Sequence, residues 1–295
     1  MPNPTDTAMV DAVVAWFDRE ARELPWRAED RSPWGVLVSE VMLQQTPVSR
    51  VAPVWEQWMD RWPTPADLAD APQAEVIRAW GRLGYPRRAM RLRECALALV
   101  AQHGGDVPRD TEQLRALPGI GEYTAAAVRA FAFGERDVVL DTNVRRVIGR
   151  AWHARPLPAA HLTRPERAHA ASLVPEGTQA SALWNAGAME LGALVCTARA
   201  PRCGECVLES SCAWVAAGSP GLDEAPRRTQ AWHGTDRQVR GRVMAVLRAA
   251  DSPVTVGGHA ALEDVEPGQL DRCLESLVAD GLITLVSEDR GAYAL

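Results

Sequence analysis

The chain has 295 residues, of which 47% are hydrophobic and 24% are charged. This composition supports a sizeable buried core and excludes wholesale disorder. No run approaches the roughly 20 apolar residues that a membrane span requires, and the N-terminal segment lacks the basic start of a signal peptide. We therefore expect a cytoplasmic protein with no membrane partner.

The net charge of −6 argues at first sight against a nucleic-acid partner, because nucleic-acid-binding domains are often basic. The charge is unevenly spread, since residues 235–295 hold ten acids and six arginines while the rest is nearly neutral. Charge alone therefore excludes neither a DNA nor a protein partner. All 32 basic residues are arginine, so no lysine amine is available to form a Schiff base.

Apolar positions recur at helical spacing through most of residues 6–195, with Pro and Gly breaks between the repeats. Short helices are predicted at Thr111–Ala116 and Glu122–Ala132. No alternating stretch of strand length precedes residue 280. The sequence therefore predicts an all-α domain of about ten helices, and residues 1–7 are interpreted as a mobile tail.

The segment Gly218–Pro226 has the composition of a linker. Beyond it, helices are predicted over Val239–Ala249 and Leu270–Asp280, and then a hairpin over Leu282–Val286 with a turn at Asp289–Gly291. Two helices followed by a small hairpin are typical of a winged-helix-like module. We expect one domain over residues 1–217, a linker over 218–235 and this module over 236–295.

Four of the six cysteines are grouped in the spacing C-x6-C-x2-C-x5-C, at Cys196, Cys203, Cys206 and Cys212. A disulfide framework is not expected in a cytosolic chain, so these thiolates are predicted to hold a metal. Zinc and a 4Fe–4S cluster both accept four thiolates, so the chemistry alone leaves both open.

The segment Leu117–Gly121 (LPGIG) separates two predicted helices. Gly119 and Gly121 allow a close approach of the backbone, and the start of the following helix presents free amides at the positive end of its dipole. This arrangement predicts a phosphate site that needs no basic side chain. Pro-Gly turns between helices are common, however, so the motif alone is only moderately specific.

Two carboxylates stand out by their context. Glu40 lies in Val38–Thr46 (VSEVMLQQT) on an otherwise apolar helix face, where desolvation would raise its pKa toward that of a general acid. Asp141 follows the LPGIG segment by twenty residues in the context LDTN. Glycosidic bond hydrolysis needs a proton for the leaving group and a negative charge near the sugar cation. The alternative for Glu40 is an exposed acid on a surface helix.

These motifs together resemble the adenine DNA glycosylases of the MutY type, which belong to the endonuclease III superfamily. The resemblance covers about residues 8–217 and implies an endonuclease III-like helix-hairpin-helix fold with a 4Fe–4S cluster, rather than zinc, in residues 196–212. It also implies a base excision repair enzyme that removes adenine opposite 8-oxoguanine or guanine. The expected partner is double-stranded DNA, and the expected location is the nucleoid.

The resemblance also implies roles for individual residues. Glu40 would protonate the leaving adenine, Asp141 would stabilise the oxocarbenium-like sugar, and Asn143 would orient the neighbouring groups. The side chains implied at the base stack or in the adenine pocket are Trp26, Arg27, Gln44, Gln45, Thr46 and Tyr85. The chain departs from the family at Pro86, where a second tyrosine often follows Tyr85, so the geometry of this loop stays open.

Tyr123 stands where the endonuclease III type carries its lysine nucleophile. A tyrosine could hydrogen-bond to Asp141 or to the attacking water, or could be an ordinary buried aromatic, but it cannot form an imine. The resemblance therefore implies a monofunctional glycosylase without lysine-based lyase activity. The only remaining amine would be that of the N-terminus.

Two other functions stay open. An endonuclease III-like lyase on oxidised pyrimidines is disfavoured by VSEVMLQQT and the lack of lysine, and a non-catalytic iron–sulfur DNA-binding protein would leave Glu40 or Asp141 idle. The MutY type usually ends in a Nudix-like domain that reads 8-oxoguanine, and residues 218–295 do not resemble it. We expect a weaker preference for 8-oxoguanine and interpret the acidic module as a packing or interaction module, with protein partners unidentified.

Overall fold

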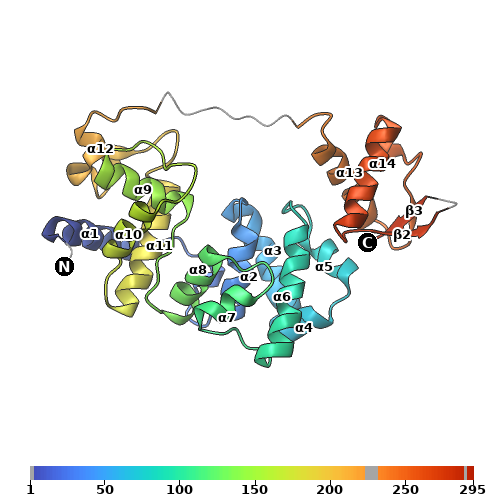
Figure 1. The fold of residues 1–295 in the computed structure, drawn as a ribbon, viewed down its shortest axis with the longest axis horizontal. Coiled ribbons are helices and arrows are strands. Elements are labelled where there is room, and N and C mark those ends of the chain that lie inside the picture. The colour runs from blue at the N-terminus through green and yellow to red at the C-terminus, as the bar shows by residue number, and fades with distance from the viewer. Residues whose placement is uncertain (1–2, 223–231, 289–290) are drawn as a thin grey trace. The chain divides into compact units, whose positions relative to one another are not determined.

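The computed structural model describes residues 3–222, 232–288 and 291–295, and most of them are helical (Figure 1). The all-α prediction is therefore confirmed. The contacts divide the chain into two compact units, Met1–Glu40 with Val107–Arg227, and Val41–Asp106 with Arg228–Leu295. The division at 217 and 236 stays a prediction, and residues 223–231 of the expected linker lie outside the described part.

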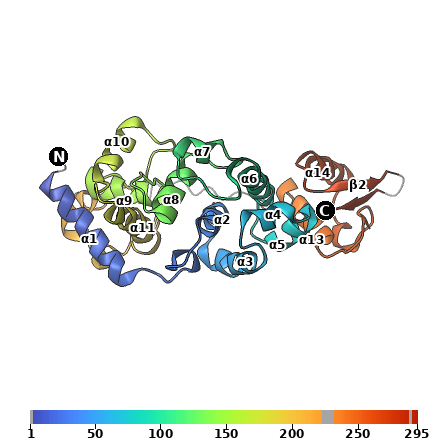
Figure 2. The ribbon, with the colours of Figure 1, turned by 90° about the horizontal axis from the view of Figure 1, so that it is seen from below.

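The first unit is built around helix α11 (Thr178–Leu194), which packs against α1 (Pro4–Glu20), α8 (Glu122–Phe133) and α9 (Thr142–His153) (Figures 1 and 2). Their apolar faces bury Trp16, Val147 and Leu191 in one core. The unit also contains η1 (Pro25–Arg27), α2 (Pro33–Leu43) up to Glu40, α7 (Thr111–Ala116), α10 (Arg164–Leu173), η2 (Cys203–Glu205), η3 (Glu209–Ser211) and α12 (Ala213–Ala216).

Helix α1 begins earlier than expected. The Asn3 side chain accepts a hydrogen bond from the backbone N–H of Thr5 at 3.1 Å, and Pro4 occupies the first helical position. Both features favour a helix start, because the cap satisfies a free amide and the proline ring presets φ. The expected mobile tail is therefore wrong for residues 3–7. Residues 1 and 2 lie outside the described part.

The second unit begins with α3 (Val48–Arg61), α4 (Pro65–Asp70), α5 (Gln73–Trp80) and α6 (Arg87–His103). Three tryptophans pack edge to face in its interior, with ring centroids 4.9 Å apart for Trp58 and Trp62 and 5.5 Å apart for Trp58 and Trp80. Such pairs add directional stabilisation to their large buried area. They fix α5 against α3 and hence the loop that follows α5.

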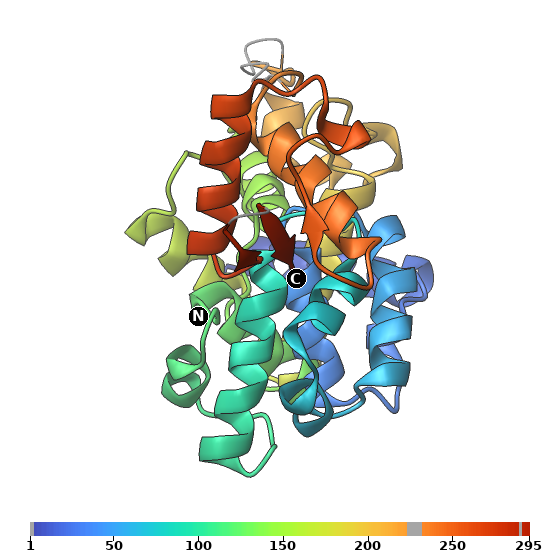
Figure 3. The same ribbon diagram turned by 90° about the vertical axis from the view of Figure 1, so that its right-hand side faces the viewer.

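The C-terminal segment of the second unit contains α13 (Asp236–Arg248), β1 (Val254–Thr255), η4 (Ala260–Leu262), α14 (Pro267–Ala279), β2 (Thr284–Ser287) and β3 (Ala292–Ala294). The helices α13 and α14 pack together, and β3 pairs antiparallel with both β1 and β2 (Figure 3). The two predicted helices and the hairpin are found. Residues 289 and 290 of the predicted turn lie outside the described part.

Two features of this segment were not expected. Strand β1 precedes residue 280, where no strand was predicted, because two residues are too short to produce an alternating pattern. The segment also packs on α5, since the Arg78 guanidinium donates to the carbonyl of Ala250 at 2.9 Å and the Gln73 amide to that of Gly281 at 2.7 Å. No described helix is long and apolar enough to cross a membrane.

The helices α9 and α11 approach most closely at Gly192. A Cβ atom at this position would lie 2.7 Å from the Cβ of Asn143 and 2.9 Å from its carbonyl oxygen. Real side chains do not tolerate such distances, and the nearby atoms include backbone that cannot move freely. Only glycine therefore allows this approach.

We expect Gly192→Ala to lower the free energy of unfolding by about 1–3 kcal/mol, as overpacking does in a tightly packed core. The measurement is the apparent Tm by circular dichroism, which should fall by several degrees. Gly149→Ala, on α9, is the control, because its Cβ would meet its nearest neighbour at an ordinary 3.7 Å. Equal melting temperatures for the two variants would contradict the steric argument.

Candidate active site

Glu40, the last residue of α2 in the first unit, is buried, with 6% of its surface exposed. Burial raises the pKa of its carboxyl to about 7. The hydrogen bond from Tyr123 and the charge of Arg27 oppose this rise in pKa, whereas the charge of Asp141 adds to it. A carboxyl with this pKa exists in both protonation states near neutral pH, as a general acid requires.

Tyr123, in the first turn of α8, donates its hydroxyl hydrogen bond to Glu40. Burial and the charges of Glu40 and Asp141 raise its pKa well above the usual range, so the phenol stays protonated and remains a donor. The tyrosine therefore faces Glu40, whereas the sequence suggested Asp141 or a water molecule as its partner.

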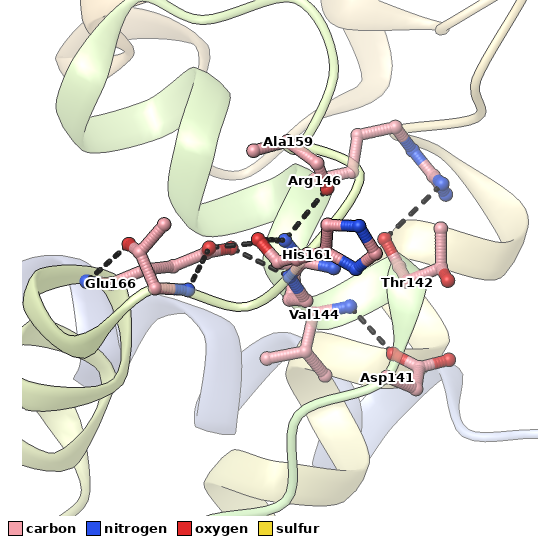
Figure 4. Close-up of polar contacts among 9 residues, drawn as sticks. Asp141, Thr142, Val144, Arg146, Ala159, His161 and Glu166 are labelled. Atoms are coloured by element: carbon pink, nitrogen blue, oxygen red, sulfur yellow. Dashed lines mark hydrogen bonds and ion pairs between the residues drawn. The ribbon is translucent and has the colours of Figure 1, made fainter.

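Asp141 caps the N-terminus of α9 (Figure 4). One carboxylate oxygen accepts from the backbone N–H of Val144 at 2.7 Å and the other from the Asn143 side-chain amide at 2.7 Å. Burial raises the pKa of Asp141, and these hydrogen bonds oppose the rise. The positive end of the α9 dipole also favours a carboxylate here, so the site places a stabilised anion beside a protonatable Glu40.

Arg146 connects this cap to the cysteine segment. Its guanidinium donates to the side-chain oxygen of Asn143 at 2.8 Å, to the carbonyl of Gly192 at 2.6 Å and to that of Cys196 at 2.7 Å. A longer bond to the carbonyl of Thr142 is drawn in Figure 4. The side chain is buried, and it holds Asn143 in the orientation in which its amide faces Asp141. The sequence did not single out this arginine.

The four predicted cysteines line one cavity together with Arg150 and Trp214. All six cysteines are free thiols, and neighbouring thiolates add to the effect of burial in raising the pKa of Cys203 and Cys206. Such a group of thiolates needs a cation to be stable. Four thiolates around one cavity are a donor set that both zinc and a 4Fe–4S cluster accept.

Arg150 is buried against this cavity with its guanidinium 4.6 Å from the ring centroid of Trp214. It donates to the carbonyl of Thr197 at 2.7 Å and approaches the sulfur of Cys196 at 3.4 Å. Helix α9 therefore contacts the cysteine segment through Arg146 and Arg150, two side chains one turn apart.

Trp26 and Arg27 lie in η1, where Trp26 is buried. Arg27 pairs with Glu190, a residue that the sequence interpretation missed. Glu190 is buried and accepts from Arg22 at 2.6 and 2.8 Å and from Arg27 at 3.1 Å. This ion pair fixes the Arg27 guanidinium whose charge acts on Glu40. Glu190 lies in an apolar stretch of α11, the same signal that singled out Glu40, so the pattern could have revealed it.

The glycine hairpin precedes α8 as predicted. Gly119 has φ +79°, in the left-handed region that glycine adopts freely, and Gly121 is the exposed N-cap residue that precedes the helix. No described side chain caps this end. The first-turn amides are therefore available to a ligand.

The remaining predicted residues lie in the second unit. Gln45 and Tyr85 are exposed and have φ of +56° and +48°, Gln44 is half-buried, and Thr46 is buried. Arg88 joins the two loops by donating to the carbonyl of Gln44 at 2.6 Å, the hydroxyl of Thr46 at 3.0 Å and the carbonyl of Gly84 at 3.1 Å. Arg88 therefore orders these two loops from inside.

Comparisons with known proteins agree with this geometry. Residues 38–170 match the family described as HhH-GPD superfamily base excision DNA repair protein, and residues 196–212 match the iron-sulfur binding domain of endonuclease III. The prediction of a 4Fe–4S cluster is therefore confirmed, and the four cysteines fit it.

Several relatives are similar over much of the chain. An adenine DNA glycosylase of Mycobacterium tuberculosis is 51% identical over 95% of this chain and 91% of its own length. The human adenine DNA glycosylase is 41% identical over 70% of this chain and 39% of its own. A thymine/uracil-DNA glycosylase of Pyrobaculum aerophilum is 34% identical over 70% of this chain and 90% of its own.

Solved structures support the same fold. A thermostable thymine-DNA glycosylase matches with a TM-score of 0.65 and 27% identity, covering 72% of this chain and 97% of that one. Endonuclease III in a non-covalent DNA complex matches with a TM-score of 0.61 and 24% identity, covering 72% and 95%. With these similarities, the helix-hairpin-helix, the cysteine segment and the buried carboxylates, the chain belongs to the adenine DNA glycosylases of base excision repair.

Proposed function

We propose that this chain is a monofunctional DNA glycosylase that hydrolyses the N-glycosidic bond of adenine opposite 8-oxoguanine or guanine in double-stranded DNA. The observation that carries the proposal is the pair formed by a buried Glu40 with a pKa of about 7 and a capped Asp141. The mycobacterial and human relatives, both adenine DNA glycosylases, support adenine as the base. We place the activity on chromosomal DNA in the cytoplasm.

In this proposal Glu40 donates its proton to the departing adenine, which lowers the barrier by neutralising the leaving group. The carboxylate of Asp141 faces the positive charge that develops on the sugar, as the second carboxylate does in glycoside hydrolysis. Asn143 favours the ionised form of Asp141 by donating to it. Tyr123 holds Glu40 in place through its hydroxyl. A water molecule then adds to the sugar cation and gives one proton to Glu40, which restores the acid.

The base must leave the duplex to reach these groups, and an extruded base needs stacking and edge contacts. Trp26 and Arg27 are the proposed contacts, and Glu190 positions Arg27. Gly119 and Gly121 would present backbone amides to a phosphate. Gln44, Gln45, Thr46 and Tyr85 would meet the base stack, with Gln45 and Tyr85 as the exposed tips of their loops.

The 4Fe–4S cluster would be held by Cys196, Cys203, Cys206 and Cys212 and would supply a rigid anchor for the segment that contains them. The segment in turn presents the carbonyl of Cys196 to Arg146. In this proposal the cluster has a structural role, and the residues named above carry out the hydrolysis.

The thymine/uracil-DNA glycosylase relative favours a second candidate, removal of a mispaired pyrimidine. Single-turnover base release distinguishes the two candidates. We expect release from duplexes with adenine opposite 8-oxoguanine or guanine, and none from those with thymine or uracil opposite guanine. Release confined to the pyrimidine duplexes would replace the proposed function by the second candidate.

Glu40→Gln should lower the single-turnover rate of adenine release by about 10²–10⁴-fold, the usual loss when a general acid is removed. Binding to the mispaired duplex should change little, because the amide keeps the shape of the carboxyl. The matched control is Glu94→Gln, an exposed acid on α6, which should retain the normal rate. A Glu40→Gln variant as fast as the control would refute the assignment.

The rate of adenine release should depend on pH through Glu40. The protonated carboxyl is the active form, so the rate should fall about tenfold per pH unit above a pKa of about 7. Tyr123→Phe removes a hydrogen bond that lowers this pKa, so the alkaline limb should move to higher pH. Single-turnover profiles from pH 5.5 to 9 measure both effects, and a limb that stays in place in Tyr123→Phe would contradict the coupling.

Base release should leave the abasic strand intact until alkali is added. The sequence contains no lysine, and Tyr123 has no amine with which to form an imine. Borohydride should therefore trap little covalent enzyme–DNA adduct, with an endonuclease III-type lyase as the positive control. Efficient trapping together with direct strand scission by this chain would show that it is bifunctional.

A further inference from the structure

Three flat side chains from distant parts of the sequence meet on the second unit. The Arg237 guanidinium, at the start of α13, lies 5.0 Å from the ring centroid of Tyr85 and 5.6 Å from that of Trp232. A second guanidinium, that of Arg88, lies 5.6 Å from the ring centroid of Tyr85. The loop after α5 and the C-terminal segment therefore share one aromatic–arginine cluster, which we call the Tyr85 platform (Tyr85, Trp232 and Arg237).

The platform is accessible. Tyr85 is 47% exposed and Trp232 is 49% exposed, which makes them the two exposed large aromatics among the described residues. Tyr85 also has φ +48°, a left-handed conformation that costs a non-glycine residue roughly 1–2 kcal/mol. Backbone strain of this kind persists where the surroundings hold it and often marks a functional position. Here Arg88 holds it, by donating to the carbonyl of Gly84.

Further arginines lie near the loop that contains Tyr85. Arg50 donates to the carbonyl of Arg82. Burial lowers the pKa of Arg88, and the positive charge of Arg50 lowers it further. Burial and the charge of Arg82 likewise lower the pKa of Arg248, in the last turn of α13. Like charges repel, so such a group favours an anionic ligand that binds between them.

Three acids of the C-terminal segment have partners in the second unit. Asp280 pairs with Arg240 at 2.5 Å and with Arg87 at 3.3 Å, and Asp264 pairs with Arg242. Asp236 accepts from the Gln269 amide at 2.9 Å. The acidic balance of residues 235–295 is therefore partly neutralised by groups of the second unit.

Exposed aromatic faces bind unstacked bases, and guanidinium groups bind phosphates. We propose that Trp232 and Arg237 extend the base-stacking surface that the proposed function gives to Tyr85, so that the platform holds an unstacked base of the bound DNA, while Arg82 contacts its phosphates. The C-terminal segment is then part of the DNA-binding surface, and not only a packing module. This inference rests on the proposed function, because that function makes a mispaired DNA duplex the ligand, with a base disturbed in its stack.

The test measures dissociation constants of the full chain by fluorescence anisotropy at several salt concentrations. One duplex carries tetrahydrofuran, a stable abasic analogue, opposite guanine, and the other is fully paired. Arg237→Ala should weaken binding of the first duplex on the order of tenfold, as loss of a stacking contact does. It should weaken binding of the paired duplex less, because paired bases offer no free face. Trp232→Ala, an exposed position that does not threaten folding, should act in the same direction.

Arg82→Ala should weaken both duplexes alike and reduce the slope of log K against log salt by about 1, as loss of one phosphate contact does. Arg242→Ala is the matched control, since it removes an arginine that pairs with Asp264 on another face of α13, and it should change neither quantity. Tyr85→Ala combined with Arg237→Ala should cost less than the sum of the single changes, because the two side chains act together.

Binding by Arg237→Ala and Trp232→Ala within twofold of the unchanged chain on both duplexes would overturn the platform. An unchanged salt slope in Arg82→Ala would overturn the phosphate contact, and the surface would then be left for a protein partner. Failure of the proposed function has a different signature. The unchanged chain would then release no adenine from its mispaired duplexes, whereas the binding measurements involve no base release.

Discussion

The close approach of α9 and α11 is the constraint on which the rest of the site depends. Gly192 has no side chain that would separate the helices, and Asn143 occupies the space. The Cβ of Asn143 lies 2.7 Å from the position that a Cβ of residue 192 would take. Arg146 then reaches the carbonyls of Gly192 and Cys196 and the side chain of Asn143 at once. Moving the helices apart would break three hydrogen bonds of a buried cation, which is costly because the charge would be left without partners.

Through this contact, packing controls chemistry. Asn143, oriented by Arg146, and the Val144 amide stabilise the ionised form of Asp141. The charge of Asp141 in turn adds to the effect of burial on the pKa of Glu40. Burial raises the pKa of both carboxyls, but Asp141 sits at a helix N-terminus with two donors, whereas Glu40 accepts from a single phenol. Because more groups oppose the rise at Asp141, we expect Glu40 to be the carboxyl that carries the proton.

The sequence predicted the helical class, the helix at Thr111–Ala116 and the iron–sulfur cluster, and it singled out Glu40, Asp141 and the four cysteines, because each depends on local spacing or on a motif. It did not predict Arg146, Arg150 or Glu190. Their roles depend on partners more than 40 residues away, and a side chain on an amphipathic helix carries no local sign of such partners. The start of α1 was missed for the opposite reason, since Asn3 and Pro4 form a helix start that a purely apolar pattern does not register.

Arginine has two roles in this chain, because it can hold parts of the fold together or contact DNA. The number of arginines does not show how many serve each role. A planar guanidinium with five donors can satisfy several carbonyls at once, as Arg88 does between two loops and Arg146 does between two helices. The compact ammonium of lysine would satisfy fewer at fixed geometry. Arginines whose donors are satisfied within the fold add little to DNA binding. The charge that we propose to contact DNA phosphates is that of Arg82, which is exposed. A net charge of −6 is compatible with DNA binding, because a phosphate responds to the charges close to it more than to the charge of the whole chain.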